Sequence, residues 1–221
     1  MYHVRGLDPD PSPQYGAQPE MLTGLLKTMR PKQWTKNVFI FAALVFDRKL
    51  FEPVWFGRTL AAFLLFCLIS SAVYIINDLV DLEKDKRHPT KRNRPLPSGQ
   101  LNPRAAAAAG AAIGVLSMAL SFVLDLEFGI IAAVYLATMI LYSFVLKNIV
   151  IIDVMTIAAG FVLRVAAGVV VFPVERFSPW LYVCMTLLAL FMGASKRRHE
   201  LVLLARDANN HRAILEEYNV D

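Results

Sequence analysis

The chain has 221 residues, of which 56% are hydrophobic and 19% are charged, whereas soluble domains average about 45–50% apolar and about 25% charged residues. This composition argues against a soluble enzyme, a coiled coil and a disordered chain. Both cysteines, Cys67 and Cys184, lie in apolar runs, which excludes a disulfide framework. A formal net charge of +5 would suit nucleic-acid binding, but in so apolar a chain it is more typical of the cytoplasmic rim of a membrane protein. We therefore predict a multi-pass membrane protein with no nucleic-acid partner.

The first predicted element, residues 1–21, is rich in proline and acidic residues and has no apolar core. A secretory signal needs a basic start and a continuous apolar stretch, so this segment is not one. We expect a disordered cytoplasmic tail.

Residues 22–195 are predicted to form an all-α, polytopic transmembrane helix bundle. A membrane span needs about 20 apolar residues, and six segments come close to that length. They lie at 33–46, 54–76, 105–124, 128–146, 149–172 and 179–195. The first is short and is expected to begin near Leu22 as an interfacial helix that Pro31 bends. The alanines and glycines that open the third either allow close helix packing or only reflect the helix propensity of alanine.

Lysine and arginine are distributed unevenly between the segments that connect the spans. With the N-terminus inside, most of these cations fall on the cytoplasmic side, including those of the segment 84–104. The positive-inside rule therefore places the N-terminus and the charged loop 77–104 in the cytoplasm, and we expect the plasma membrane as the location.

An acidic motif follows the second predicted span. Asn77, Asp81 and Asp85 are spaced i, i+4 and i+8, and Asp78 lies on the same helical stripe. Lys84 is expected to point elsewhere. Because a bare row of carboxylates repels itself, a divalent cation would stabilise it, and oxygen ligands without histidine or cysteine favour Mg²⁺. We expect Asp78, Asp81 and Asp85 as metal ligands; the alternative is a solvated helix end of mixed charge.

A basic, proline-stiffened loop comes directly after the acidic motif. Pro89 is expected to end the helix, and arginine suits bidentate recognition of phosphate. The loop's candidate phosphate ligands are Lys86, Arg87, Lys91, Arg92 and Arg94. Acidic residues for a metal beside cations for phosphate oxygens indicate a diphosphate site, although the cations also serve as a positive-inside anchor.

These two segments resemble the UbiA-type intramembrane prenyltransferase superfamily. NDLVDLEKD matches the N-D-x-x-D-x-x-x-D signature of that family, and HPTKRNRPLPSG resembles the loop that follows it there. MRPKQWTKN at 29–37, KNIVIIDVMTIAAGFVLRVAAG at 147–168 and GASKRRHEL at 193–201 are most similar to its actinobacterial branch, which transfers phosphoribose.

The resemblance implies a reaction. Phosphoribose would move from phosphoribosyl diphosphate to decaprenyl phosphate, with release of diphosphate, and the product would feed arabinose donors of arabinogalactan and lipoarabinomannan. The polyprenyl tail would lie in an apolar groove open to membrane lipids. In this mechanism Mg²⁺ neutralises the leaving group, Asn77 orients ligands, and the acceptor phosphate needs no strong general base.

The chain departs from the family pattern after the sixth predicted span. Prenyltransferases carry a second aspartate motif there, whereas this chain has Lys196, Arg197 and Arg198. These cations suit a lipid monophosphate and weaken the alternative function, prenylation of an aromatic acceptor; their other interpretation is a positive-inside stop.

Further candidates lie inside or at the ends of the spans. Arg164 falls in the middle of the fifth span, where a charge is costly and indicates either a ligand site or a structural pair with Asp153 or Glu175. The remaining candidate ligands are Lys32, Lys36, Asn37, Tyr142 and Lys147. For Lys147, beside Tyr142, the alternative is topological anchoring.

Residues 196–221 are expected to form an amphipathic cytoplasmic segment, and the resemblance implies further spans after it, which would make this chain a truncated one. A homo-oligomer is left open. A transporter is the alternative from another class, but transporters carry charged or broken helices at the midplane, and here the acidic residues lie at the rim.

Overall fold

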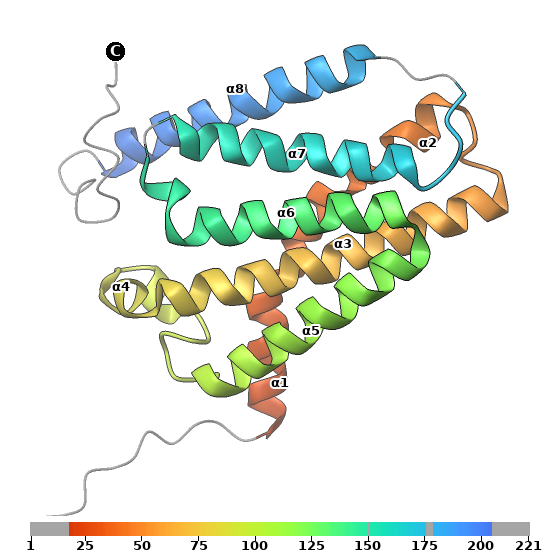
Figure 1. Cartoon of the computed structure of the whole chain (residues 1–221). Helices are drawn as coiled ribbons and strands as arrows, with labels where there is room; N and C mark the ends of the chain where they lie inside the picture. The colour runs from red at the N-terminus through yellow and green to blue at the C-terminus, as the bar shows by residue number, and fades with distance from the viewer. Residues whose placement is uncertain (1–17, 150, 176–178, 205–221) are drawn as a thin grey trace, which may run out of the picture.

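A computed structural model describes residues 18–149, 151–175 and 179–204. The regular structure of these residues is entirely helical (Figure 1). The α-helices are α1 (Gln18–Met29), α2 (Ala42–Phe46), α3 (Pro53–Val80), α4 (Leu82–Arg87), α5 (Pro103–Leu124), α6 (Leu126–Phe144), α7 (Ile152–Val170) and α8 (Pro179–Leu204). The 3₁₀ helices are η1 (Pro31–Phe41), η2 (Lys91–Asn93) and η3 (Leu146–Asn148).

Four of these helices, α3, α5, α6 and α7, are long and apolar enough to cross a membrane, and Pro179–Ser195 is a shorter apolar stretch. The predicted helix bundle is confirmed, but the count of six spans is not. The segment predicted as the first span, 33–46, forms η1 and the five-residue helix α2. Its polar residues explain the difference, because Asn37 is fully buried among other helices rather than facing lipid.

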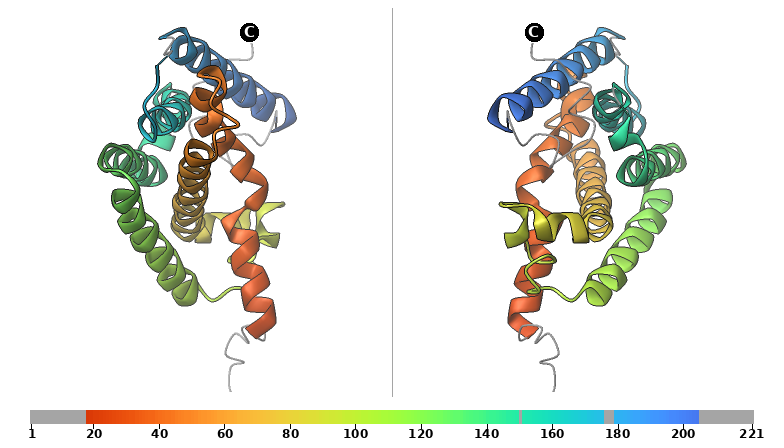
Figure 2. Two further views of the ribbon diagram at one scale, coloured as in Figure 1. Left: turned by 90° about the vertical axis from the view of Figure 1, so that its right-hand side faces the viewer. Right: turned by 90° about the vertical axis from the view of Figure 1, so that its left-hand side faces the viewer.

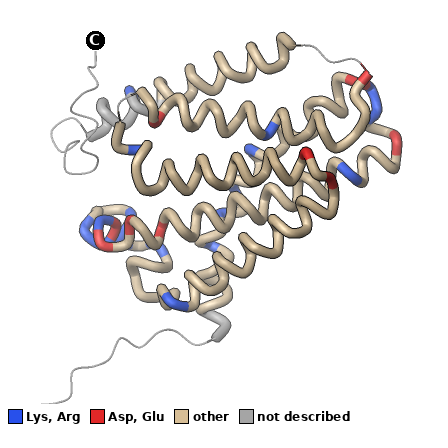
Figure 3. The backbone as a smooth tube through the Cα atoms, in the orientation of Figure 1, with Lys and Arg blue, Asp and Glu red and all other residues tan. Residues whose placement is uncertain are grey.

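The long helices form an arc around a central helix. In the views of Figure 2, α5, α6, α7 and α8 follow one another around α3 and η1, and each neighbouring pair in that order is in contact. The core between them contains Phe66, Phe128 and Ile40, all fully buried. Figure 3 shows that charged residues gather at the two ends of the bundle.

Local signals in the sequence set the helix boundaries. The first helix ends before Pro31, where Arg30 adopts a left-handed conformation (φ 54°), which produces the predicted bend. Helix α1 begins at Gln18, within the segment predicted as a tail; residues 1–17 lie outside the described part. The Asn102 side chain caps α5 by accepting from the Arg104 backbone N–H at 2.8 Å, and Asp125 caps α6 in the same way.

Small residues allow two close helix contacts. A Cβ atom at Gly110 of α5 would lie 3.0 Å from the Ile75 side chain of α3, so the small residues of the third predicted span do pack against a neighbour. A Cβ atom at Gly168 of α7 would lie 2.0 Å from the Ile40 carbonyl oxygen of η1. The second contact holds η1 against α7 and fixes the position of Asn37.

Candidate active site

The acidic motif lies where α3 passes into α4. Asp81 stands between the two helices, and its carbonyl oxygen accepts from the Asp85 backbone N–H at 2.8 Å, so the stripe predicted from the spacing is nearly continuous. The Asp78 and Asp85 side chains are each 2% exposed, whereas that of Asp81 is 24% exposed. Two buried carboxylates in one motif need strong compensation.

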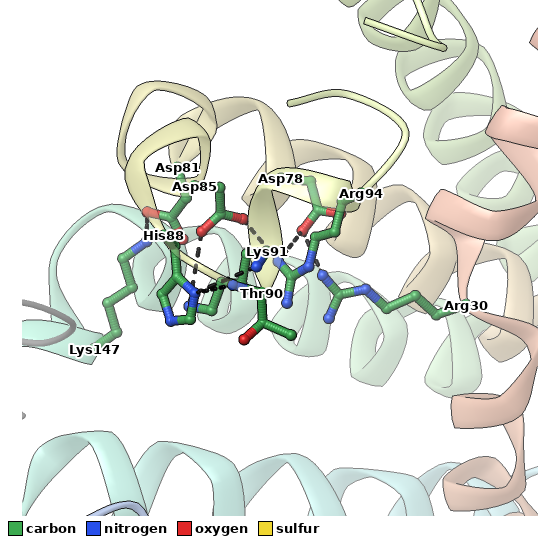
Figure 4. Close-up of polar contacts among 9 residues, drawn as sticks. All are labelled: Arg30, Asp78, Asp81, Asp85, His88, Thr90, Lys91, Arg94 and Lys147. Atoms are coloured by element: carbon green, nitrogen blue, oxygen red, sulfur yellow. Dashed lines mark hydrogen bonds and ion pairs between the residues drawn. The ribbon is translucent and has the colours of Figure 1, made fainter. Parts of the chain in front are cut away.

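Four basic side chains supply that compensation (Figure 4). The Arg30 guanidinium pairs with Asp78, and the Arg94 Nη1 atom lies 3.3 Å from Asp78 and 2.8 Å from Asp85. The Lys91 Nζ atom lies 3.7 Å from the Asp85 carboxylate, and the Lys147 Nζ atom lies 2.6 Å from the Asp81 carboxylate. In this structure, cations from three separate segments relieve the carboxylate repulsion that the sequence led us to assign to a metal.

The basic loop is ordered by its own contacts. Helix α4 ends at Arg87, just before Pro89 as predicted, and the His88 Nδ1 atom accepts from the backbone N–H groups of Thr90 and Lys91. Leu96 is buried and ties the loop to the core around α1. Burial lowers the pKa of the Lys91 ammonium group, and the nearby Asp85 carboxylate opposes this effect.

A cavity of about 470 Å³ opens beside the motif. Its charged and polar lining comes from η1, α3, α4, the basic loop, α6, α7 and η3. The lining side chains with polar groups are Arg30, Lys36, Tyr74, Asn77, Asp81, Lys84, Asp85, His88, Lys91, Arg94, Tyr135, Tyr142, Ser143, Lys147, Asn148 and Arg164. Apolar residues of α7 and α8, such as Phe161 and Met192, complete the wall.

Arg164 lies in the wall of this cavity and is held by uncharged groups. Its Nε atom donates to the Asn37 Oδ1 atom at 2.8 Å, and its Nη2 atom donates to the Tyr135 hydroxyl at 2.8 Å. Its Nη1 atom donates to the Gly160 carbonyl oxygen at 2.7 Å. Neither carboxylate considered from the sequence is a described partner: Glu175 pairs with Lys49 instead.

The structure brings together nine of the predicted site residues as cavity lining: Lys36, Asn77, Asp81, Asp85, Lys91, Arg94, Tyr142, Lys147 and Arg164. Asp78 is buried beside them and contacts the lining residues Arg30 and Arg94. Asn37 is not part of the lining; it lies behind Arg164.

Other predicted ligands do not reach the cavity. Four of them, Lys32, Lys86, Arg87 and Arg92, are exposed and absent from its lining. Lys86 pairs with Glu83 at 2.6 Å. In the basic cluster of α8, Arg198 is exposed and not part of the lining, and the side chains of Lys196 and Arg197 fall outside the described residues. Spacing alone did not distinguish the inward cations of the loop from the outward ones.

Sequence reasoning missed several lining residues, namely Tyr74, His88 and Tyr135, and the expectation that Lys84 points elsewhere was wrong. Tyr74 comes one turn before Asp78 on α3, so helical periodicity offered a signal for it. Lys84 reaches the cavity because α4 starts anew after Asp81. Nothing in the local sequence of α6 indicated Tyr135.

The residues present fit a magnesium ion held jointly with a ligand. Among the described residues, no group of three acidic, histidine or cysteine side chains could hold a metal by itself. Asp81 and Asp85 both line the cavity, and Mg²⁺ in proteins is usually bound by one or two carboxylates together with substrate phosphates. A complete three-aspartate site, as the sequence suggested, is therefore not preformed.

A second hollow, of about 490 Å³, lies at the opposite end of the bundle beside Arg58 and Asp125. There the Arg58 Nε atom donates to the Val171 carbonyl oxygen at 2.8 Å, so its polar atoms serve to join helix ends. The acidic motif and the basic loop both belong to the first cavity, which we take as the candidate active site.

Comparison with known proteins identifies a family for most of the chain. Residues 37–200 match the UbiA prenyltransferase family. The chain is 35% identical to the decaprenyl-phosphate phosphoribosyltransferase of Mycolicibacterium smegmatis, over 93% of this chain and 66% of that protein. It is 36% identical to the enzyme of that name from Corynebacterium glutamicum, over 88% of this chain and 60% of that protein. The chain thus spans about two thirds or less of the length of these relatives.

Solved structures share the fold. A UbiA homologue from Archaeoglobus fulgidus bound to DMAPP and Mg²⁺ superposes with a TM-score of 0.72 at 19% identity, over 88% of this chain and 69% of that one. A digeranylgeranylglyceryl phosphate synthase gives a TM-score of 0.71 at 20% identity, over 90% of this chain and 70% of that one.

Proposed function

The chain belongs to the UbiA prenyltransferase family, and from this premise we propose that it transfers 5-phosphoribose from phosphoribosyl diphosphate to decaprenyl phosphate, releasing diphosphate. The observation that carries the proposal is the cavity that joins the acidic motif to cations from η1, the basic loop, α7 and η3. The relatives named decaprenyl-phosphate phosphoribosyltransferase support this choice of substrates. The product would serve as a precursor of cell-wall arabinose donors.

The donor's diphosphate group would bind at the mouth of the cavity. Arg94, Lys91 and Arg30 already point at the aspartates there (Figure 4), and they would turn part of their donor capacity to phosphate oxygens. Asn77 would orient the ligand beside them. The exposed cations Lys86, Arg87 and Arg92 would act only through the electrostatic field that attracts the anionic donor.

Asp81 and Asp85 would hold Mg²⁺ together with the diphosphate, and Asp78, which is buried beside them, would support their positions. When bound, the ion would neutralise charge on the leaving group. Lys147 and Arg94 are paired with these aspartates in the structure. On binding, the aspartates would interact both with these two cations and with the ligand.

The transfer step forms a bond between an oxygen of the acceptor phosphate and C1 of the ribose, and it breaks the bond between C1 and the diphosphate oxygen. The acceptor phosphate is anionic at neutral pH, so no strong general base is required. Positioning and electrostatic stabilisation then provide most of the rate enhancement. Tyr142 and Lys147, both in the cavity lining, are the proposed contacts for the acceptor phosphate. The predicted α8 cations Lys196, Arg197 and Arg198 would attract this phosphate by their charge.

The same proposal sets the protein in the plasma membrane with its N-terminus and this cavity facing the cytoplasm. Residues 1–21 would be a cytoplasmic tail, 22–195 the membrane bundle with the loop 77–104, and 196–221 a cytoplasmic segment before further spans. The excess of lysine and arginine around the cavity supports this orientation.

Transfer of radiolabel from phosphoribosyl diphosphate into extracted lipid tests the function. The purified protein, with decaprenyl phosphate and Mg²⁺, should label the lipid, and Asp81→Ala or a chelator should abolish the label. The assay is run on this chain and on one extended past Asp221. If the extended chain labels no lipid but joins a prenyl diphosphate to an aromatic acid, the proposed donor is wrong and the protein is an aromatic prenyltransferase.

A further inference from the structure

Arg164 is a buried cation at a distance from the acidic motif. Its side chain is 6% exposed, and the rings of Tyr135 and Phe161 lie 4.9 and 5.3 Å from its guanidinium carbon. Aromatic faces and carbonyl or amide oxygens stabilise a guanidinium without neutralising its charge. Within the described part of the chain, no carboxylate lies within 4.0 Å of it, because the ion pairs there involve other cations.

Burying a charge in this way costs free energy, and a bound anion would offset that cost. Three of its five N–H groups donate to Asn37, Gly160 and Tyr135, so two remain for a ligand in the cavity that Arg164 lines. An arginine in the wall of a polar cavity inside a membrane bundle is by default a hypothesis of a functional site. Two oxygen atoms of one phosphate group can accept from two guanidinium N–H groups at once, so a phosphate matches the two remaining donors of Arg164.

Arg164 lies in α7, and the part of α3 to which Asn37 connects it is separate from the diphosphate site. Its anchor Asn37 donates to Ser70 and Cys67 of α3, whereas the acidic motif begins at Asn77 and Asp78. Eight residues of helix between Ser70 and Asp78 correspond to about 12 Å of axial rise. One cavity thus reaches from the acidic and basic cluster to Arg164, and Lys36 and Tyr74 also belong to its lining.

We propose that Arg164 binds a phosphate monoester at the inner end of the cavity, and that this group is the 5-phosphate of the donor. The inference rests on the proposed function, since only a phosphoribosyl donor carries an anionic group at each end of a small molecule. Asn37 is a positioning residue, because it holds the guanidinium from outside the cavity lining, and Tyr135 holds the guanidinium from within that lining. Arg164 thereby selects a phosphorylated sugar donor over a prenyl diphosphate, whose far end is apolar.

The test compares two donors that differ by one group. Dissociation constants of the purified chain are measured with phosphoribosyl diphosphate and with ribosyl 1-diphosphate, which lacks the 5-phosphate, each with Mg²⁺. The wild-type chain is expected to bind the first on the order of 10- to 100-fold more tightly, as for hydrogen bonds to a charged group. Arg164→Gln should reduce this ratio to about one while leaving the affinity for ribosyl 1-diphosphate unchanged.

Two further variants keep the test independent of misfolding. Asn37→Asp has nearly the same volume and sets a carboxylate against the Arg164 Nε atom, so it should remove the preference while a purely structural Arg164 would gain a favourable pair. Arg164→Lys keeps the charge and should retain part of the preference. Ser121→Ala, whose hydroxyl donates within α5 to the Ser117 carbonyl oxygen outside the cavity lining, should leave the ratio at its wild-type value.

The outcomes separate the two proposals. A wild-type chain that does not bind phosphoribosyl diphosphate contradicts the proposed function. A chain that binds it with a ratio unaffected by Arg164→Gln and Asn37→Asp overturns the present inference alone. If those variants instead weaken binding of decaprenyl phosphate relative to decaprenol, the monoester belongs to the acceptor lipid and the assignment to the donor is wrong.

Discussion

Arg94 is the side chain that joins two buried carboxylates, since one of its nitrogens contacts both Asp78 and Asp85. Two positions earlier in the same loop, Arg92 is exposed. The sequence offers both as phosphate ligands, and only the fold distinguishes them. Single residues in this loop therefore differ in function although they share composition and spacing.

Arg94→Ala should weaken binding of diphosphate with Mg²⁺ by about 10- to 100-fold, because a hydrogen bond to a charged group contributes about 1.5–3 kcal/mol. It should also lower the melting temperature, since two buried carboxylates lose a cation. Isothermal titration with diphosphate and thermal unfolding in detergent measure the two effects. Arg92→Ala is the matched control: it should leave the melting temperature unchanged and weaken binding far less than Arg94→Ala, because Arg92 acts only through the long-range field. Equal losses in both variants would contradict the placement of Arg94.

Asp85→Asn should remove most of the Mg²⁺ dependence of diphosphate binding, because a buried carboxylate of the cavity is replaced by a weaker neutral ligand. Titrations with and without a chelator measure that dependence. Glu83 is two residues away from Asp85, exposed and paired with Lys86. Glu83→Gln should therefore retain the wild-type Mg²⁺ dependence. Retention of the full dependence in Asp85→Asn would exclude Asp85 as a metal ligand.

At the scale of elements, the contact between η1 and α7 decides where Asn37 and Arg164 meet. This contact is possible because Gly168 has no side chain: an added Cβ atom would lie 2.0 Å from the Ile40 carbonyl oxygen. Backbone atoms cannot move away as a flexible side chain could. The helices must therefore separate if the glycine is replaced.

Gly168→Ala should destabilise the protein by about 1–3 kcal/mol or more, the range for overpacking a core, and should lower its melting temperature in detergent. Gly57→Ala in α3 is the matched control, because nothing lies within 4 Å of its added Cβ atom. Alanine is favoured over glycine in a helix by about 1 kcal/mol, so this control should be neutral or stabilising. Equal melting temperatures for the two variants would contradict the close contact.

At the scale of the whole molecule, charge is concentrated at the two ends of the bundle (Figure 3). The end with the candidate site carries more cations than acidic residues among its cavity lining. By the positive-inside rule this excess supports the proposed orientation, in which the site faces the cytoplasm.

Labelling with a membrane-impermeant thiol reagent, in whole cells and in inverted vesicles, tests this orientation. The experiment uses a background in which Cys184, the exposed native thiol, is replaced by alanine. Ser98→Cys, in the basic loop, should react only in inverted vesicles. Phe51→Cys, at the opposite end and 93% exposed as the native residue, should react only in whole cells. The reverse pattern would place the site outside the cytoplasm.

The sequence by itself determined the class of fold, the break at Pro31, the end of α4 before Pro89 and the acidic motif. Each of these depends on local chemistry: hydropathy over a helix length, the restricted backbone of proline and the helical period. It also predicted that Arg164 is unusual, because a charge in an apolar span is costly wherever its partners lie.

Only the tertiary structure decided which cations face the aspartates and what surrounds Arg164. Arg30, Arg94 and Lys147 come from segments far apart in the sequence, and their convergence on one motif depends on how α1, the basic loop and η3 pack around α3. Tyr135 and Asn37 reach Arg164 from α6 and η1. Such contacts depend on packing between helices, and the local sequence of any one helix does not encode it.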